Sequence, residues 1–133
     1  MHQSSVQPLL DLPLFAGLSA AAQTSLLSQS FVQTQPAEAE LFEQGQMAQF
    51  LHVILQGRVA LVGEAPAMEA SAPAERQAII EIFEPGEAII LAAVLLDMPY
   101  LMSARIMAPA RIAFVPAPLV REFIDREAAF GKA

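Results

Sequence analysis

Few side chains in this sequence have the types and spacing that catalysis requires. The chain has two histidines, His2 and His52, and no cysteine. This spacing supports no Ser-His-Asp set, and the lack of cysteine excludes disulfides, zinc–thiolate sites, iron–sulfur clusters and thiol catalysis. Neither a G-x-x-x-x-G-K-[ST] loop nor a G-x-G-x-x-G loop occurs. We therefore expect no catalytic residues and no metal site.

One pair of carboxylates has a spacing that acid–base chemistry could use. Glu38 and Glu40 are two residues apart, but they lie in a segment that we expect to be exposed. A solvated face is the default for carboxylates on an exposed segment, so this pair indicates a polar surface and not a catalytic pair. The chain is predicted not to be an enzyme.

The net charge argues against direct binding to polyanions. The 133 residues carry 7 Lys+Arg against 14 Asp+Glu, for a formal charge of −7. Nucleic acid and anionic membranes are usually bound by a basic face, and the cations here are scattered. The N-terminus has no basic leader, and no apolar run reaches the roughly 20 residues that cross a bilayer. We expect one cytoplasmic domain that binds neither DNA nor membrane by itself.

The ends of the chain have helical signals. A short helix is expected over 5–15, ended by Pro13, and a second from an N-cap at Ser19 to about residue 30. A last helix is expected over 118–129, with Pro118 in its first turn and Gly131 after its end. Its apolar stripe consists of Leu119, Val120, Phe123 and Ile124.

The middle of the chain has strand signals. Strands are expected at 40–43, 49–55, 58–62, 77–83, 100–107 and 110–115. Gln56-Gly57 is interpreted as a hairpin turn, Pro109 as a break, and 64–76 as an exposed mobile loop. The fold class is therefore mainly β with flanking helices: a small antiparallel barrel or sandwich over 31–115, packed against helices at 5–30 and 118–129.

The stretch from Gly86 to Ala104 is the candidate pocket wall. It opens with a predicted type II turn at Glu84-Pro85-Gly86-Glu87, followed by nine apolar residues at 88–96. Asp97-Met98-Pro99 then breaks the run before a strand from Tyr100. A short apolar coil or helical turn between two turns can form the wall of a pocket.

Several segments together resemble the cyclic-nucleotide-binding domains. Residues 41–46 (LFEQGQ) and 50–59 (FLHVILQGRV) resemble the paired-glycine signature, and 83–87 (FEPGE) resembles the turn before the phosphate-binding cassette. Residues 12–18 (LPLFAGL) resemble the N-terminal entry of the family. The resemblance covers about residues 10 to 129 and is greatest to the sensor domain of Crp/Fnr-type bacterial transcription regulators.

This resemblance implies a fold and partners. The fold is a jelly-roll barrel, also called a double-stranded β-helix, with N-terminal helices and a C-terminal helix. Regulators of this type dimerise and bind DNA through a helix-turn-helix, which the resemblance places outside this chain. We therefore expect 1–133 to be a single sensor domain, with a homodimer and DNA contacts belonging to a longer regulator.

The cassette departs from the pattern that binds cyclic nucleotides. The family pattern is F-G-E-[LIV]-A followed by R-[ST]-A, in which Glu contacts the ribose and Arg the cyclic phosphate. The resemblance places Leu91 at the Glu, Met102 at the Arg and Ile90 at the glycine. Losing a charged hydrogen-bond partner costs roughly 1.5–3 kcal/mol, so two losses weaken binding about 100- to 10⁴-fold. We expect cAMP and cGMP not to bind usefully.

These replacements make the predicted effector pocket apolar. The candidate lining residues are Ile90, Leu91, Ala92, Val94, Met102, Ser103 and Ala104, with Leu95, Met98 and Met107 nearby. Such a pocket is either filled by its own side chains or open to an apolar effector. Haem is one candidate, because the resemblance includes haem-carrying gas sensors, and His52 is then the candidate axial ligand.

Two alternatives remain. Ser103 and Arg105, two residues apart on one strand face, are the only support for an altered cassette in which Arg105 contacts the phosphate. A ligand-free domain that dimerises through the stripe of the last helix is the other. The sequence does not distinguish these from a sensor of an apolar effector.

Overall fold

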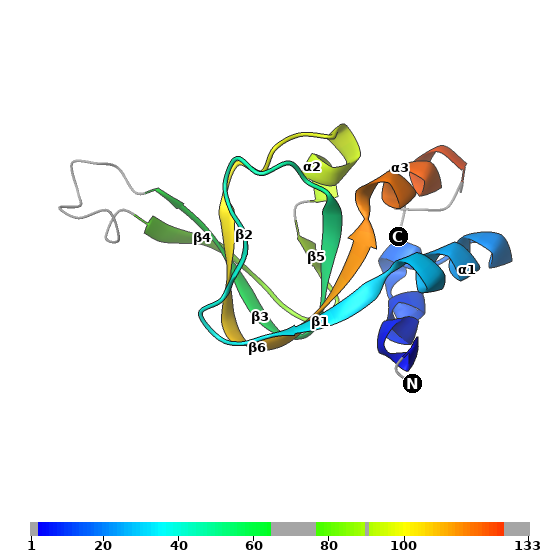
Figure 1. The fold of residues 1–133 in the computed structure, drawn as a ribbon, viewed down its shortest axis with the longest axis horizontal. Coiled ribbons are helices and arrows are strands. Elements are labelled where there is room, and N and C mark those ends of the chain that lie inside the picture. Colours follow the sequence, from blue (N-terminus) through cyan, green and yellow to red (C-terminus); the bar gives the residue numbers. More distant parts are fainter. Residues whose placement is uncertain (1–2, 65–76, 90, 127–133) are drawn as a thin grey trace.

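The computed structural model describes residues 3–64, 77–89 and 91–126 (Figure 1). Helices η1 (Gln3–Asp11), η2 (Pro13–Phe15) and α1 (Ala20–Gln29) come first. Ser19 caps α1 as predicted, because its side chain accepts a hydrogen bond of 3.1 Å from the Ala22 amide. The helix predicted over 5–15 is thus two 3-10 segments, separated just before Pro13.

Six strands form one antiparallel sheet. They are β1 (Phe31–Gln35), β2 (Glu40–Phe42), β3 (Phe50–Glu64), β4 (Gln77–Phe83), β5 (Ala88–Ile89) and β6 (Ser103–Pro116). The order is β1-β6-β3-β4, with β2 also paired to β6 and β5 to β3. Helix α2 (Leu91–Leu96) lies between β5 and β6, and α3 (Ala117–Arg126) follows β6 directly.

The fold class predicted from sequence is confirmed, with one correction. The sheet is mainly antiparallel, carries helices at its side and has the curled jelly-roll form (Figure 1). It is not closed into a barrel: among the described strands, no ladder joins β4 to β1. The reason is that β3 and β6 use both of their edges for other partners, which leaves β1 and β4 as the ends of the sheet.

The predicted hairpin at Gln56-Gly57 is wrong. Strand β3 continues through this point for 15 residues, and Gly57 adopts a φ of 95° at an irregular step in the pairing with β6. The glycine signal was real, but it marks a bulge that bends a long strand and not a chain reversal.

The predicted break at Pro109 is also wrong. Strand β6 runs unbroken from Ser103 to Pro116, and Pro109 lies opposite Gly57. The ladder is interrupted there, between the pairs Gln56–Arg111 and Arg58–Ala108. Proline has no N–H to donate, and at a bulge the ladder does not require one. Pro109 is therefore accommodated within the strand. The strand starts at Ser103 and not at Tyr100, because residues 100–102 belong to the connection from α2.

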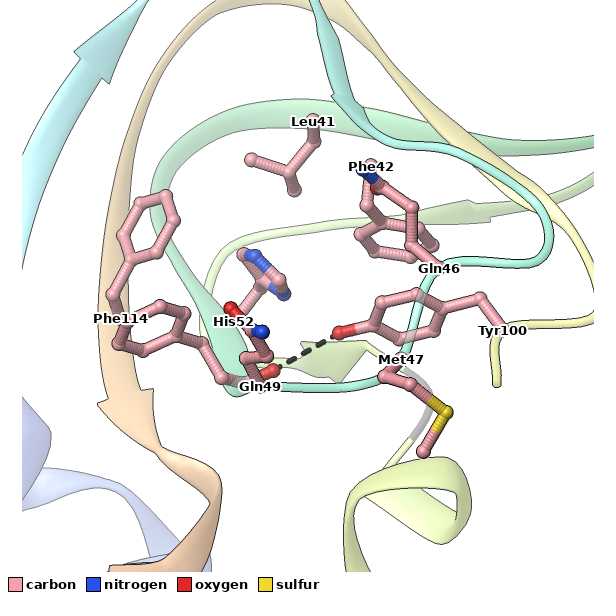
Figure 2. A pocket seen from close by; sticks show the side chains of 9 residues that line it. Leu41, Phe42, Gln46, Met47, Gln49, His52, Tyr100 and Phe114 are labelled. Atoms are coloured by element: carbon pink, nitrogen blue, oxygen red, sulfur yellow. Dashed lines mark hydrogen bonds between the residues drawn. The ribbon is translucent and has the colours of Figure 1, made fainter. Parts of the chain in front are cut away.

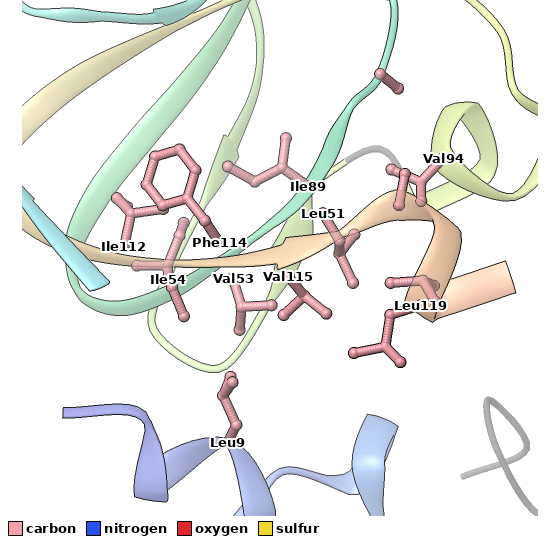
Figure 3. Close-up of a cluster of buried hydrophobic side chains, with 14 of the residues drawn as sticks. Leu9, Leu51, Val53, Ile54, Ile89, Val94, Ile112, Phe114, Val115 and Leu119 are labelled. Carbon is pink, nitrogen blue, oxygen red and sulfur yellow. The ribbon is translucent and has the colours of Figure 1, made fainter. Parts of the chain in front are cut away.

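The core occupies both faces of the β3–β6 ribbon (Figure 3). Ile54, Ile112 and Phe114 point to the inside of the curl, together with Ile89 from β5. Val53 and Val115 point to the other side, where Leu9 of η1 covers them. The alternation of side chains along each strand thus separates an inner core from a helix-covered core.

The C-terminal helix belongs to this second core. Helix α3 begins at Ala117, one residue before the predicted start, and the predicted residues 127–129 lie outside the described part. Leu119, Val120 and Phe123 are each at most 4% exposed, whereas Ile124 is 45% exposed. Most of the predicted apolar stripe is therefore packed within the domain.

The bend at Gly57 gives the first prediction. A Cβ at residue 57 would lie 2.6 Å from the Ala110 Cα and from the Pro109 carbonyl oxygen. Both neighbours are backbone and cannot move aside cheaply, and the positive φ adds strain. We expect Gly57→Ala to lower the free energy of unfolding by about 3 kcal/mol or more in urea titrations.

Gly45→Ala is the matched control. Gly45 has the same φ of 95°, but a Cβ there meets no atom within 4 Å. In the control variant the free energy of unfolding should fall by only about 1 kcal/mol, which is the cost of a positive φ at a residue with a Cβ. If the free energy of unfolding falls equally in both variants, then the close approach of Gly57 to the backbone of β6 is not what requires glycine at this position.

Candidate functional site

The turn before the cassette forms as predicted. Gly86 has a φ of 94°, and the Glu87 amide donates a hydrogen bond of 3.1 Å to the Glu84 carbonyl, as in a type II turn. The Gly86 amide donates to the Ile54 carbonyl at 2.7 Å. This bond ties the turn to β3, so the start of the cassette is fixed to the central ribbon.

Helix α2 ends at Leu96, and the next residue, Asp97, is left-handed with a φ of 55°. The Met98 amide donates to the Ala93 carbonyl at 3.0 Å, which is the long bond of a Schellman end. The carbonyl of Val94 accepts from the Asp97 amide at 3.4 Å and also from Nη1 of Arg121 of α3 at 2.7 Å. The same Nη1 lies 3.9 Å from an Asp97 carboxylate oxygen, so one side chain joins α3 to the end of α2.

A first cavity, of about 250 Å³, lies between α2 and the segment that leads to β6. We call it the cassette cavity. Its lining residues are Ala92, Ala93, Leu96, Met98, Pro99, Leu101 and Met102. All of them are apolar, and Met102 stands at the position that the family pattern gives to arginine. The described lining thus offers a phosphate no charge and no side-chain hydrogen bond.

The other residues predicted for the pocket lie elsewhere. Val94 and Ala104 are fully buried in the core and line neither cavity described here. Leu91 begins α2, but its side chain is not described, and Ile90 lies outside the described residues. Of the seven predicted lining residues, the structure brings Ala92 and Met102 to the cassette cavity.

Ser103 and Arg105 alternate with the buried Ala104 and Ile106, so they point to the opposite face of β6. The Ser103 hydroxyl oxygen accepts a hydrogen bond of 2.9 Å from the Gln44 amide. Arg105 lies across from Glu40 of β2 and lines neither cavity. Its contact with a phosphate stays a prediction without geometric support.

A second cavity, of about 400 Å³, lies inside the curl between β2, β3 and the end of β6. We call it the histidine cavity. Its lining residues are Leu41, Phe42, Gln46, Met47, Gln49, Phe50, His52, Tyr100 and Phe114 (Figure 2). Phe42 stacks on Tyr100 with 3.8 Å between ring centroids. The Tyr100 hydroxyl donates to the Phe50 carbonyl at 3.0 Å, which holds the stacked pair in place.

His52 is a buried polar side chain in this apolar wall. It is 5% exposed, and its Nδ1 has no hydrogen-bond partner. Burial lowers the pKa of His52 to about 4, so the imidazole is neutral near pH 7. Burial also raises the pKa of Tyr100 to about 12, which keeps its phenol protonated.

His52, the candidate haem ligand, is surrounded by aromatic rings. The ring centroids of Phe114, Phe42 and Tyr100 lie 4.8, 5.2 and 6.4 Å from that of His52. A porphyrin bonded to the imidazole would need a broad flat space that these rings occupy. The described arrangement therefore does not fit a haem on His52, and haem ligation stays a prediction.

Three consecutive residues separate the two cavities. Pro99 and Leu101 line the cassette cavity, whereas Tyr100 lines the histidine cavity. The backbone of Tyr100 is fixed to the loop after β2: its amide donates to the Gln46 carbonyl at 2.9 Å, and its carbonyl accepts from Gly45 at 2.8 Å. One short segment therefore forms part of both walls.

The sequence alone does not predict the aromatic wall. Tyr100 marks only the start of a predicted strand there, and no local pattern connects it with Phe42 and Phe114. They lie 72 residues apart, and only the pairing of β2 and β3 with β6 brings them together. The available signal was the alternation at Phe50 and His52, which places both side chains on one face of β3.

Within residues 3–64, 77–89 and 91–126, no group of three or more His, Asp or Glu side chains is placed to hold a metal ion. None of the helices in these ranges is long and apolar enough to cross a membrane.

Comparison with known proteins identifies the family. The profile of the cyclic nucleotide-binding domain matches residues 32–127. This chain belongs to the cyclic nucleotide-binding domain family. Comparison with curated protein sequences gives no significant match.

Solved structures show the same fold. The sensor domain of the transcriptional regulator DNR from Pseudomonas aeruginosa has a TM-score of 0.80 at 19% identity, over 98% of this chain and 83% of that one. A Ruegeria pomeroyi DSS-3 protein, provisionally assigned as cyclic nucleotide binding, has a TM-score of 0.76 at 24% identity, over 98% of this chain. The Thermus thermophilus catabolite activator protein has a TM-score of 0.67 at 20% identity, over 90% of this chain and 53% of that one.

These comparisons confirm the resemblance to the sensor domains of Crp/Fnr-type regulators. The cyclic nucleotide-binding domain described here spans about half the length of the first solved structures that it matches, at 55% and 56%. The matched proteins named above are regulators or binding proteins rather than enzymes.

Burial of His52 predicts a pH-dependent stability. The folded-state pKa of about 4 lies below the ordinary value of 6.5, so the unfolded chain binds more protons between these values. Stability therefore falls as the pH drops from about 6.5 towards 4, by about 3 kcal/mol in total from this group. His52→Phe should flatten the slope of unfolding free energy against pH in urea titrations from pH 7 to 4.5.

His2→Gln is the control, since it removes the other histidine of the chain. In this variant the slope of unfolding free energy against pH should equal that of the wild type. Carboxylates also contribute to that slope, and both variants retain them. If His52→Phe retains the full wild-type slope, then His52 is not a neutral buried group.

The link between α3 and α2 predicts a local change in dynamics. Arg121→Met removes the shorter of the two hydrogen bonds to the Val94 carbonyl while keeping the aliphatic part of the side chain. A net hydrogen bond of about 1 kcal/mol corresponds to roughly fivefold to tenfold faster local opening. Hydrogen exchange should therefore speed up at the amides of residues 94–98.

Arg111→Met is the matched control, because Arg111 lies on β6 opposite Gln56 and Thr34, away from α2. Exchange at 94–98 should remain at the wild-type rate in this variant. Equal rates in both variants would show that Arg121 does not hold the end of α2.

Proposed function

We propose that this chain is the effector-sensing domain of a Crp/Fnr-type transcription regulator whose effector is not a cyclic nucleotide. The family assignment and the likeness to the DNR sensor domain support the first part. The chain spans 83% of that sensor domain but only 53% of the longer DNR chain, as expected for one domain of a regulator.

The composition of the cassette cavity is the observation that carries the second part. Its described lining is entirely apolar, and Met102 stands where the family pattern has arginine. A cyclic phosphate that enters this cavity would lose its hydration and gain no charged partner. The net charge of −7 adds an unfavourable long-range term for an anion.

An apolar effector fits this cavity better. A volume of about 250 Å³ exceeds the roughly 150 Å³ that holds a benzene molecule in an apolar protein cavity. Leu96, Leu101 and Met98 are 66%, 71% and 40% exposed at the cassette. A small hydrocarbon-like effector would cover part of this surface, which provides a driving force for binding.

The response would pass to the rest of the regulator through α3. Arg121 joins α3 to the end of α2, beside the cassette cavity. Under this proposal, homodimerisation belongs to the long dimerisation helix of the full regulator and DNA binding to its helix-turn-helix. Dimerisation through the stripe of α3 alone is a weaker alternative, since Leu119, Val120 and Phe123 are packed inside the domain.

Restoring the family anchors tests the proposal. We expect no heat from wild-type protein titrated with cAMP to 1 mM in calorimetry. The double variant Leu91→Glu with Met102→Arg supplies the missing ribose and phosphate partners. Two charged hydrogen bonds of roughly 1.5–3 kcal/mol each should tighten cAMP binding by about 100-fold or more.

Met107→Arg is the matched control. Met107 lies on β6, five residues after Met102; it is 38% exposed and lines neither cavity. It adds the same charge without reaching the cassette, so it should leave cAMP binding undetectable. Measurable cAMP heat with the wild-type protein, at a Kd of about 10 µM or tighter, would overturn the proposal.

A further inference from the structure

We propose that the histidine cavity is a second ligand site, which takes a neutral, planar aromatic molecule carrying one hydroxyl group. It shares no lining residue with the cassette cavity. The inference does not depend on what the cassette cavity binds.

The walls of the cavity indicate an aromatic ligand. Its volume of about 400 Å³ falls in the range of small-molecule sites and is well over twice that of a cavity that holds benzene. The rings of Phe42, Tyr100 and Phe114 supply surfaces on which an aromatic ring can pack. The volume is large enough for two fused rings.

The charge of the walls indicates a neutral ligand. The described lining contains no Asp, Glu, Lys or Arg, and its polar side chains are two glutamines, His52 and the Tyr100 hydroxyl. The imidazole is itself neutral near pH 7, because burial lowers the pKa of His52 to about 4. A charged group in this cavity would lose its hydration without finding an opposite charge.

The unpartnered nitrogen of His52 indicates a hydroxyl group. A buried imidazole nitrogen without a hydrogen bond is costly, and the side chain is only 5% exposed. Since no partner fixes Nδ1, the neutral ring can carry its proton on either nitrogen and present a donor or an acceptor to a ligand. A hydroxyl group can satisfy both forms, because it donates one hydrogen bond and accepts others.

Water alone accounts for less of this cavity. The lining offers a water molecule polar partners at Gln46, Gln49 and the Tyr100 hydroxyl, but the cavity is far larger than one water requires. An aromatic alcohol packs on the ring surfaces, which water cannot pair with, and forms a hydrogen bond as well.

Two probes of equal shape test the proposal. 2-Naphthol carries the hydroxyl, and 2-methylnaphthalene replaces it with a methyl group. Each is titrated into the wild-type domain while imidazole and aromatic side-chain NMR signals are followed. We expect 2-naphthol to shift the His52 signals, to show contacts to Phe42 and Tyr100, and to bind about fivefold to tenfold more tightly than 2-methylnaphthalene.

Variants separate this site from the cassette. His52→Phe should abolish the preference for the hydroxyl, so that 2-methylnaphthalene binds at least as tightly as 2-naphthol. Leu96→Arg alters the cassette cavity at a position that is 66% exposed and lies on α2, and it should leave the affinity for 2-naphthol within about twofold. The wild-type NMR titration decides the question on its own if His52→Phe does not fold.

Three results would overturn the proposal. The first is the absence of any His52 shift at 1 mM 2-naphthol, as expected for a cavity that holds only water. The second is equal or tighter binding of 2-methylnaphthalene by the wild-type domain. The third is a set of shifts confined to α2 and residues 98–102, which would assign the probe to the cassette cavity and leave the proposed function untouched.

Discussion

The contact of Gly57 with the backbone of Pro109 and Ala110 is the constraint on which the rest of this domain depends. It allows two long strands, β3 and β6, to bend together while remaining paired on both sides of the bend. The bent ribbon carries every other strand: β1 and β2 pair with β6, while β4 and β5 pair with β3. Both cavities are therefore positioned by elements attached to one ribbon.

Local signals in the sequence were reliable where the structure is decided locally. The cap at Ser19 and the turn at Glu84–Glu87 form as predicted, because each depends on residues within one turn of chain. The same holds for α3, whose start at Ala117 is within one residue of the expected position. Family resemblance added the fold class and the location of the cassette, which no single motif specifies.

The errors arose where one residue type has two structural uses. Gly57 has the conformation expected of a turn glycine, yet it serves a bulge inside a strand, and Pro109 lies within a strand for the same reason. The choice between a turn and a bulge depends on whether a partner strand lies opposite. That partner, β6, begins at Ser103, 46 residues after Gly57, so a short window of sequence cannot contain the answer.

The candidate sites show the same limit. The resemblance to the family assigns Met102 to the cassette, because the family pattern fixes its place. The ring of aromatic side chains around His52 could not, since Phe42, Tyr100 and Phe114 come from three separate segments. Their meeting depends on the sheet register, which neither composition nor periodicity reveals.

The segment Pro99–Tyr100–Leu101 is a partition between two compartments. Its alternate residues face the cassette cavity and the histidine cavity, and its backbone is bonded to the loop after β2. A shift of this partition that enlarges one compartment narrows the other. Occupancy of the two compartments is then coupled through a shared wall, and such a coupling is reciprocal: whatever penalty the first occupant sets for the second, the second sets for the first.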